Sequence, residues 1–224
     1  MTDPVTDPSA NPVFDAMLAE LSERQREDVL AGYAALEHSA EPVHEALLPA
    51  LRDATLRRSL TELLHGLGRT LIKLSGNHWT SGYRDDIQAE LTRDGWHPLE
   101  RVDRAILTLV LVHSVAIPRS EGGLRIDQDA DTWTSPHPTS PDEIFKHSHL
   151  PREEARTALG RLRAAGLVQL DRRRGTGYIP GPQFNRLTPA ARRRLQEELI
   201  LAAGPDTPLA AAIRIRRLHN QGNS

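Results

Sequence analysis

The chain has 224 residues and a formal net charge of −2, and 38% of its residues are hydrophobic. This hydrophobic share is enough for a core and argues against a chain that is disordered throughout. The sequence contains no cysteine, which excludes disulfides, thiolate metal sites and cysteine nucleophiles. No apolar run approaches the ~20 residues that span a bilayer. The first residues also lack the basic start and apolar stretch of a signal peptide. We therefore expect a soluble cytoplasmic protein with no membrane partner.

The small net charge hides a difference between the two halves of the chain. Residues 1–97 carry 16 acidic and 9 basic side chains, whereas residues 98–224 carry 14 acidic and 19 basic ones. Nearly all of this positive charge is arginine, whose planar guanidinium suits the recognition of phosphate and guanine. A charge division of this kind predicts a nucleic-acid partner for the basic half.

The first half of the chain shows helical patterning. Residues 1–11 are rich in proline steps and poor in apolar side chains, which indicates a flexible tail. Apolar residues then recur at spacings of three and four over about residues 12–38, 51–74 and 82–93, with a short helix between the first two. We therefore predict that residues 12–97 form an acidic helical domain without strands. Its broad apolar stripes favour a dimer interface or a protein partner, and completion of a single intramolecular core is the alternative.

A long break separates the two halves. Residues 98–117 predict one more amphipathic helix. Residues 118–139 are rich in proline, glycine and aspartate, so we expect a loop there with a short strand at 124–126. A structureless segment of this length is unusual inside a compact domain, which points to a functional or mobile loop.

The second half begins again with clear helix signals. A serine followed by proline starts a short helix at residues 140–148, and a longer helix follows over residues 152–165. Two strands, at residues 167–170 and 178–179, flank a basic turn that is closed by glycine. A last capped helix covers residues 190–203.

This order of short helix, tight turn, longer helix and two-stranded ribbon with an arginine-rich tip resembles a winged helix-turn-helix. The segment Thr188-Pro-Ala-Ala-Arg-Arg-Arg-Leu resembles the helix after the wing in regulators of the multiple-antibiotic-resistance repressor type. The resemblance covers residues 98–203, about half of the chain. It implies a mainly α fold, in which a helical N-terminal domain precedes a winged helix-turn-helix domain with a small two- or three-stranded β-ribbon.

The remaining residues, 204–224, form a basic amphipathic segment. We expect this segment to dock onto protein. An extended DNA contact or an anionic membrane surface are the alternatives.

The longer helix is the predicted DNA-reading element. When its apolar residues Ala155, Leu159 and Leu162 face the core, its other side faces outward, and the first turns of such a helix approach base edges in the major groove. The arginine turn suits insertion into a minor groove or a clamp on phosphates. Acidic residues in the first turn of the longer helix argue against DNA binding, because they repel phosphate, unless one of them accepts a hydrogen bond from a cytosine amino group. The predicted DNA contacts are Arg152, Glu153, Arg156, Thr157, Arg161, Arg172, Arg173, Arg174 and Thr176.

Catalysis and metal binding find little support in the sequence. It contains no phosphate-binding glycine loop, no Gly-x-Ser-x-Gly elbow and no dinucleotide fingerprint, so we expect neither an enzyme nor a cofactor. His137, His147 and His149 lie close together in the sequence, but none of these pairs has the i, i+4 spacing that places two ligands on one helical face. We therefore predict no metal site, with these histidines exposed to solvent.

Three functions remain open at this stage. The leading hypothesis is a sequence-specific regulator of transcription that binds double-stranded DNA, a homodimeric repressor whose two recognition helices read half-sites about one helical turn apart. The first alternative is a winged-helix interaction subunit of a chromosome-maintenance, plasmid-transfer or defence complex, with non-specific DNA binding or none. The second is a sensor gated by a ligand or a metal.

Overall fold

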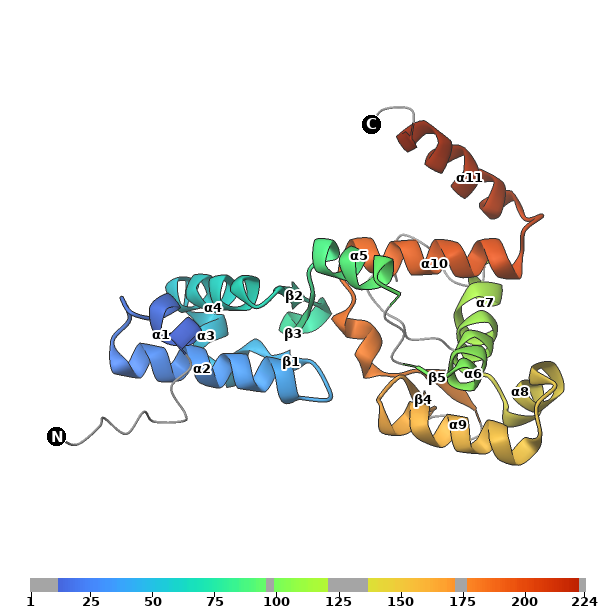
Figure 1. Cartoon of the computed structure of the whole chain (residues 1–224), viewed down its shortest axis with the longest axis horizontal. Helices are drawn as coiled ribbons and strands as arrows, with labels where there is room; N and C mark the ends of the chain where they lie inside the picture. The colour runs from blue at the N-terminus through green and yellow to red at the C-terminus, as the bar shows by residue number, and fades with distance from the viewer. Residues whose placement is uncertain (1–11, 96–98, 121–136, 172–176, 222–224) are drawn as a thin grey trace. The chain divides into compact units, whose positions relative to one another are not determined.

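The structure is a computed structural model that describes residues 12–95, 99–120, 137–171 and 177–221 (Figure 1). The chain divides into two compact units, residues 1–87 and 88–224, near the boundary predicted at residue 97. The predicted tail at 1–11 and the predicted strand at 124–126 lie outside the described residues. None of the helices in the described ranges is both long enough and apolar enough to cross a membrane.

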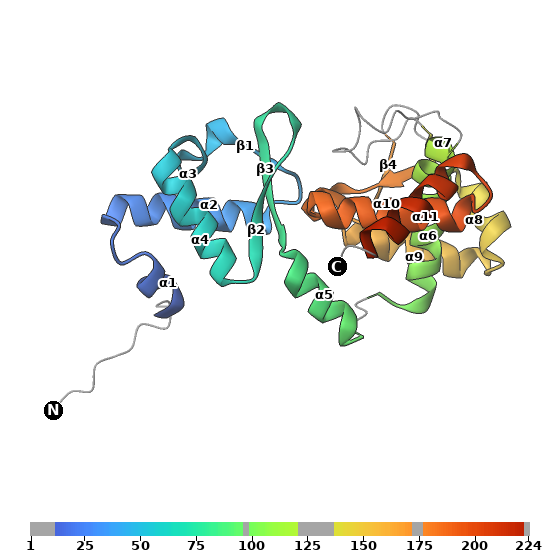
Figure 2. The same cartoon turned by 90° about the horizontal axis from the view of Figure 1, so that it is seen from above.

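The first unit combines helices with a small antiparallel sheet. The strand order is β1-β3-β2, so the last strand lies between the other two. Figure 2 shows β2 and β3 as a long hairpin. The elements are α1 (Pro12–Met17), α2 (Glu23–His38), β1 (Val43–His44), a 3-10 turn (Glu45–Leu47), α3 (Pro49–Arg52), α4 (Ala54–Gly66), β2 (Arg69–Lys73), a 3-10 turn (Ser75–Asn77), β3 (His78–Tyr83) and α5 (Asp85–Arg93), which continues into the second unit.

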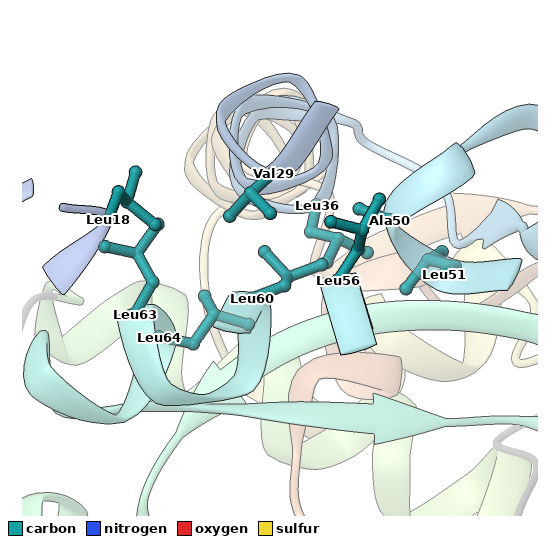
Figure 3. Packing of buried hydrophobic residues seen from close by; sticks show 9 residues of the cluster. All are labelled: Leu18, Val29, Leu36, Ala50, Leu51, Leu56, Leu60, Leu63 and Leu64. Carbon is teal, nitrogen blue, oxygen red and sulfur yellow. The ribbon is translucent and has the colours of Figure 1, made fainter. Parts of the chain in front are cut away.

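The core of the first unit is built almost entirely from leucine. Leucines of α4 recur at spacings of three and four, so they lie on one face and pack against α2 (Figure 3). Gly32 of α2 allows this close packing, because a Cβ at that position would lie 3.0 Å from the Cβ of Ala50. The buried residues are Leu18, Val29, Leu36, Ala50, Leu51, Leu56, Leu60, Leu63 and Leu64.

The prediction of a first half without strands is wrong. The helix expected over 51–74 ends at Gly66, and its last part is strand β2; the helix expected over 82–93 begins only at Asp85, after strand β3. The physical reason lies at Gly68, whose φ of +72° is a left-handed conformation that ends the helix. Gly76 and Asn77 also have positive φ, which is the backbone that a tight hairpin turn requires.

Two smaller predictions in the first unit also need correction. The helix expected over 12–38 is divided into α1 and α2, and α2 starts at a capping box in which the Ser22 backbone N–H donates to Gln25 at 3.1 Å. The short helix expected between the first two is a two-residue strand, β1, followed by a 3-10 turn.

The second unit follows the predicted order closely. The capping box at its second helix is present, since the Ser140 N–H donates to Glu143 Oε2 at 2.7 Å and the Glu143 N–H donates to Ser140 Oγ at 3.2 Å. The elements are α6 (Arg101–Leu111), a π-helical segment (Val112–Ala116), α7 (Ile117–Ser120), α8 (Pro141–Ser148), α9 (Arg152–Ala164), β4 (Val168–Leu170), β5 (Tyr178–Pro180), a 3-10 turn (Pro182–Arg186), α10 (Pro189–Ala203) and α11 (Pro208–Gln221).

A carbonyl group at the end of α6 links this helix to the sheet of the second unit. The carbonyl oxygen of Val110 accepts hydrogen bonds from the hydroxyl of Ser114 at 2.6 Å and from the hydroxyl of Thr139 at 3.2 Å. Thr139 forms a backbone bridge with Tyr178 of β5, which in turn pairs with β4. A mainly α unit with a small antiparallel ribbon is therefore confirmed.

The two units share one topology that no sequence repeat reveals. Each runs through a helix, a short strand or bridge, two further helices and a β-hairpin: α2, β1, α3, α4, β2, β3 in the first, and α6, Thr139, α8, α9, β4, β5 in the second. In both, the first strand position pairs with the last strand, which pairs with the middle one. The order predicted for residues 98–203 therefore occurs twice in the chain.

We predict that Gly181→Ala destabilises the second unit by about 1–3 kcal/mol, the usual cost of overpacking. A Cβ at this position would lie 2.2 Å from the carbonyl oxygen of Gly166, a backbone atom that cannot move aside independently. Thermal and urea unfolding of the full chain measure the effect. Gly160→Ala is the control, because a Cβ there meets nothing within 4 Å and the change gains up to about 1 kcal/mol of helix propensity. Equal stability of Gly181→Ala and the unmodified chain would contradict the prediction.

Candidate functional site

Helix α9 turns its apolar side inward, as predicted. Ala155, Leu159 and Leu162 are buried in one core with Ile106, Val110 and Ile144. The predicted contact residues Arg152, Glu153, Arg156 and Thr157 are all exposed, and so is Gly160 on the same side of the helix. This core fixes which side of α9 a nucleic acid or a protein partner can reach.

The first turns of α9 carry two arginines above one aromatic ring. The Cζ atoms of Arg152 and Arg156 lie 5.6 and 5.9 Å from the ring centroid of Phe145 in α8. Distances of this size give cation–π attraction of about 0.5–1 kcal/mol at exposed sites. The N–H donors of Arg152 have no hydrogen-bond partner among the described residues, whereas Arg156 donates to Glu153.

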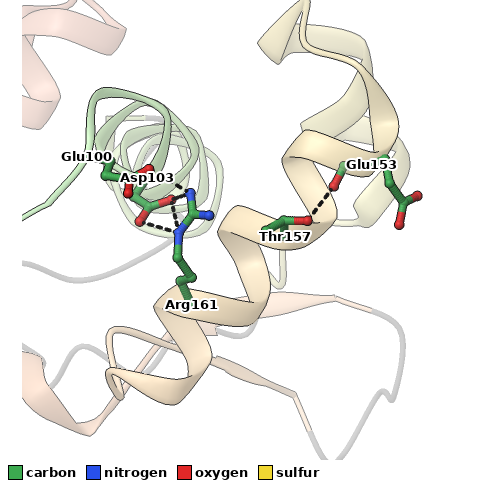
Figure 4. A network of polar contacts seen from close by, with 5 residues as sticks. All are labelled: Glu100, Asp103, Glu153, Thr157 and Arg161. Carbon is green, nitrogen blue, oxygen red and sulfur yellow. Dashed lines mark hydrogen bonds and ion pairs between the residues drawn. The ribbon is translucent and has the colours of Figure 1, made fainter.

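Acidic groups offset much of this positive charge. Arg156 pairs with Glu153 at 3.2 Å. The Thr157 hydroxyl donates to the Glu153 carbonyl oxygen at 2.9 Å (Figure 4). Both partners of the ion pair are largely exposed, so it contributes at most about 1 kcal/mol and can be exchanged for another partner. Glu154 is also exposed on the first turn. The start of α9 therefore presents charges of both signs.

Arg161 is partly exposed, but a buried carboxylate of its own unit holds it. Its Nη2 lies 2.6 Å from Asp103 Oδ1 and its Nε lies 3.0 Å from Asp103 Oδ2, a two-pronged contact from α9 to α6 (Figure 4). Asp103 is 4% exposed, and Glu100 adds a second carboxylate at 3.2 Å. The hydrogen bond with Asp103 raises the pKa of the Arg161 guanidinium above its ordinary value. Releasing Arg161 to a phosphate would leave a buried carboxylate without its partner.

The predicted arginine tip lies outside the described residues. This applies to Arg172, Arg173, Arg174 and Thr176, whereas the strands β4 and β5 on either side of the tip are present and antiparallel. The ribbon that the sequence predicted is therefore confirmed, and contacts made by its tip stay predictions.

Two residues that shape this surface were not among the predicted site residues. Phe145 is a partly buried member of the α8 face that packs on the core, and Asp103 is a buried acid on the apolar side of α6. A signal for Asp103 exists in the sequence, because it falls four residues after Leu99 and three before Ile106, at a core position. A carboxylate at such a position predicts a buried cationic partner.

His113 and His147 form a contact between the π-helical segment and α8. Their ring centroids lie 5.1 Å apart. Burial and the like charge of His147 lower the pKa of His113 below its ordinary value, against an opposing effect of Glu143. In the described ranges no three histidine or acidic side chains come together in a way that could hold a metal ion.

Comparisons with known proteins identify no family for this chain. No family model matches it, and no curated protein matches it. Among solved structures, one match is the crystal structure of ScpB from Mycobacterium tuberculosis, at 17% sequence identity and a TM-score of 0.23. The match covers 79% of this chain and 98% of that chain. At this TM-score the similarity supports no conclusion about fold or function.

We predict that Arg161→Ala lowers the thermal unfolding midpoint of the chain more than Arg163→Ala does. The first change leaves the buried Asp103 carboxylate without its cation, whereas Arg163, on the same helix, pairs with no carboxylate among the described residues. The paired change Asp103→Ala with Arg161→Ala should be less harmful than the sum of the two single changes, since neither charge is then left alone. If the two single changes lower the free energy of unfolding additively, the coupling energy between Asp103 and Arg161 is zero and the prediction is wrong.

We predict that the second unit loses stability as the pH falls from 7.5 to 5.5. Because the pKa of His113 is lowered in the folded chain, below pH ~6.5 the unfolded chain binds a proton that the folded chain excludes. His113→Gln should reduce this decrease in the thermal unfolding midpoint. His38→Gln, in the first unit, should preserve it. A decrease of the same size in His113→Gln and the unmodified chain would contradict the assignment.

Proposed function

We propose that this chain is a tandem winged-helix interaction subunit of a larger DNA-associated complex, of the chromosome-maintenance, plasmid-transfer or defence class. In this proposal both units are winged helix-turn-helix modules. The chain contacts duplex DNA weakly and without sequence preference, and its main role is to bind protein. The proposal rests first on the outer face of α9.

That face offers few free donors for reading bases. Of the five predicted DNA-contact residues that the structure describes, Arg152 has no ion-pair or hydrogen-bond partner, and Arg156 has only an exposed, exchangeable ion pair with Glu153. Thr157 and Arg161 are engaged within the second unit. A bidentate arginine contributes about 1–3 kcal/mol of base discrimination. Specific binding exceeds non-specific binding by about 4–10 kcal/mol. Two arginines therefore reach at most the lower part of this range, which favours binding without sequence preference.

Exposed apolar side chains support a protein partner. On α11, Ala210 and Ile213 are buried, whereas Ile215 and Leu218 are 57% and 69% exposed and stand three residues apart on the helix. Leu47 of the first unit is 73% exposed, in the turn between β1 and α3. Large apolar groups on a helix face are typical of surfaces that another protein covers.

A sequence-specific regulator is the second candidate function. One observation favours it: Gly160 leaves the middle of the outer face of α9 open, and Arg163 beyond it is exposed. A DNA backbone can approach a helix closely at such a position. This candidate requires a homodimer, so that two copies of α9 read two half-sites.

Selection of bound sequences from a random duplex library at physiological salt distinguishes the two candidates. We expect retention without enrichment of any motif. We also expect Arg152→Ala with Arg156→Ala to weaken the binding of all duplexes alike and to reduce its salt dependence, because only phosphate contacts are lost. Arg24→Ala with Arg26→Ala, on α2 of the first unit, is the charge-matched control. Enrichment of a palindrome that Arg152→Ala abolishes would overturn the proposal in favour of the regulator.

A further inference from the structure

Helix α11 carries a second apolar stripe that its own unit leaves uncovered. One side of the helix packs on α10 and buries Ala210 and Ile213. Ala211, Ile215 and Leu218 follow one another at spacings of four and three residues, so they form a stripe on another side of the helix, and all three are exposed. A helix that buries one apolar stripe and exposes another is suited to lie between its own unit and a second protein surface.

The charges of α11 determine which kind of surface can cover this stripe. Arg214 lies beside the stripe, three residues after Ala211 and four before Leu218. Its guanidinium is exposed, donates to the carbonyl oxygen of Pro205 at 2.8 Å, and pairs with no carboxylate among the described residues. The sequence of α11 contains no acidic residue, so a second copy of α11 would bring like charges together. A surface that covers the stripe therefore has to combine apolar and acidic side chains.

Helix α5 of the same chain has this combination. Ile87 and Leu91 are four residues apart, so they share one face of the helix, and both are partly exposed. Glu90 and Asp94, each three residues further along, lie beside them. Both carboxylates are exposed and pair with no cation among the described residues. Every residue of α5 is at least partly exposed, so its apolar face is available to a partner.

We propose that two copies of this chain associate through these helices, with α11 of each copy on α5 of the other. The exposed stripe of α11 covers Ile87 and Leu91, and Arg214 meets the carboxylates beside them. Because α5 has only nine residues, one such contact is small beside the ~1,200 Å² or more that stable interfaces bury, and a two-fold dimer makes the contact twice.

This inference goes beyond the proposed function and does not depend on it, since self-association needs neither DNA nor a further protein. The exposed Leu47 of the first unit stays available to another partner.

Sedimentation equilibrium of the full chain tests the proposal. We expect a reversible equilibrium between the 24.9 kDa monomer and its dimer. Ile215→Ser with Leu218→Ser should weaken the dimer at least about tenfold, because apolar area is lost at both contacts. Leu47→Ser, which changes an exposed apolar side chain elsewhere, is the control and should leave the dissociation constant unchanged. The substituted residues are exposed, and circular dichroism checks that each variant folds.

Charge reversal tests the pairing of α11 with α5. Arg214→Glu and Glu90→Arg should each weaken the dimer about tenfold, because like charges then oppose each other at both contacts. An equimolar mixture of these two variants should regain the dimer, since a dimer of one copy of each again joins opposite charges at both contacts. A contact within one chain cannot be restored by mixing. Arg163→Glu and Glu62→Arg, which reverse exposed charges elsewhere, should each dimerise like the unmodified chain.

Four results would overturn the proposal. They are a chain that stays monomeric at high micromolar concentration, association into species larger than a dimer, a dimer that Ile215→Ser with Leu218→Ser leaves intact, and a mixture of the reversed variants that dimerises no better than its components. None of them bears on the proposed function, which the selection from the duplex library tests separately.

Discussion

The ion pair between Asp103 and Arg161 determines which residues of α9 are available to bind DNA, and the proposed function of the second unit depends on it. It joins α6 to α9 through a carboxylate that is 4% exposed and a guanidinium that reaches it with two nitrogen atoms. A buried carboxylate is costly without its cation. Arg161 is therefore held by a buried partner, although its own side chain is partly exposed and lies on the helix that the sequence predicts to read DNA.

The rest of the surface follows from this arrangement. The apolar side of α9 and the Asp103 contact orient the helix, and the outward side then shows Arg152, Arg156 and two acids over the Phe145 ring. Such a face is suited to weak contact with phosphate more than to base recognition. The repeated topology and the exposed apolar side chains of α11 agree with the proposed role as an interaction subunit.

Sequence patterns predict the second unit better than the first, for physical reasons that particular residues show. Ser140, Glu143 and Gly166 give unambiguous helix starts and stops, so α8 and α9 are found where expected. In the first unit the leucines at 67, 71 and 74 continue the helical spacing of three and four past Gly66, although the chain forms β2 there. Strands as short as β1 and β2 contain too few residues to show the alternation of apolar and polar side chains that identifies a strand. The position of Asp103 predicts some cationic partner, but that this partner is Arg161 could not be predicted, because the two residues are 58 positions apart and meet only through the packing of α6 on α9.

The most direct test of this account is the NMR spectrum of the arginine Nε–H groups, recorded with and without a short duplex. The Asp103 contact predicts that the Arg161 Nε–H exchanges slowly with water and keeps its position when duplex is added, while the Arg152 signal shifts or broadens. An Arg161 Nε–H that exchanges as fast as that of Arg163 and shifts on addition of duplex would show that this side chain is free to bind DNA, and would contradict the account.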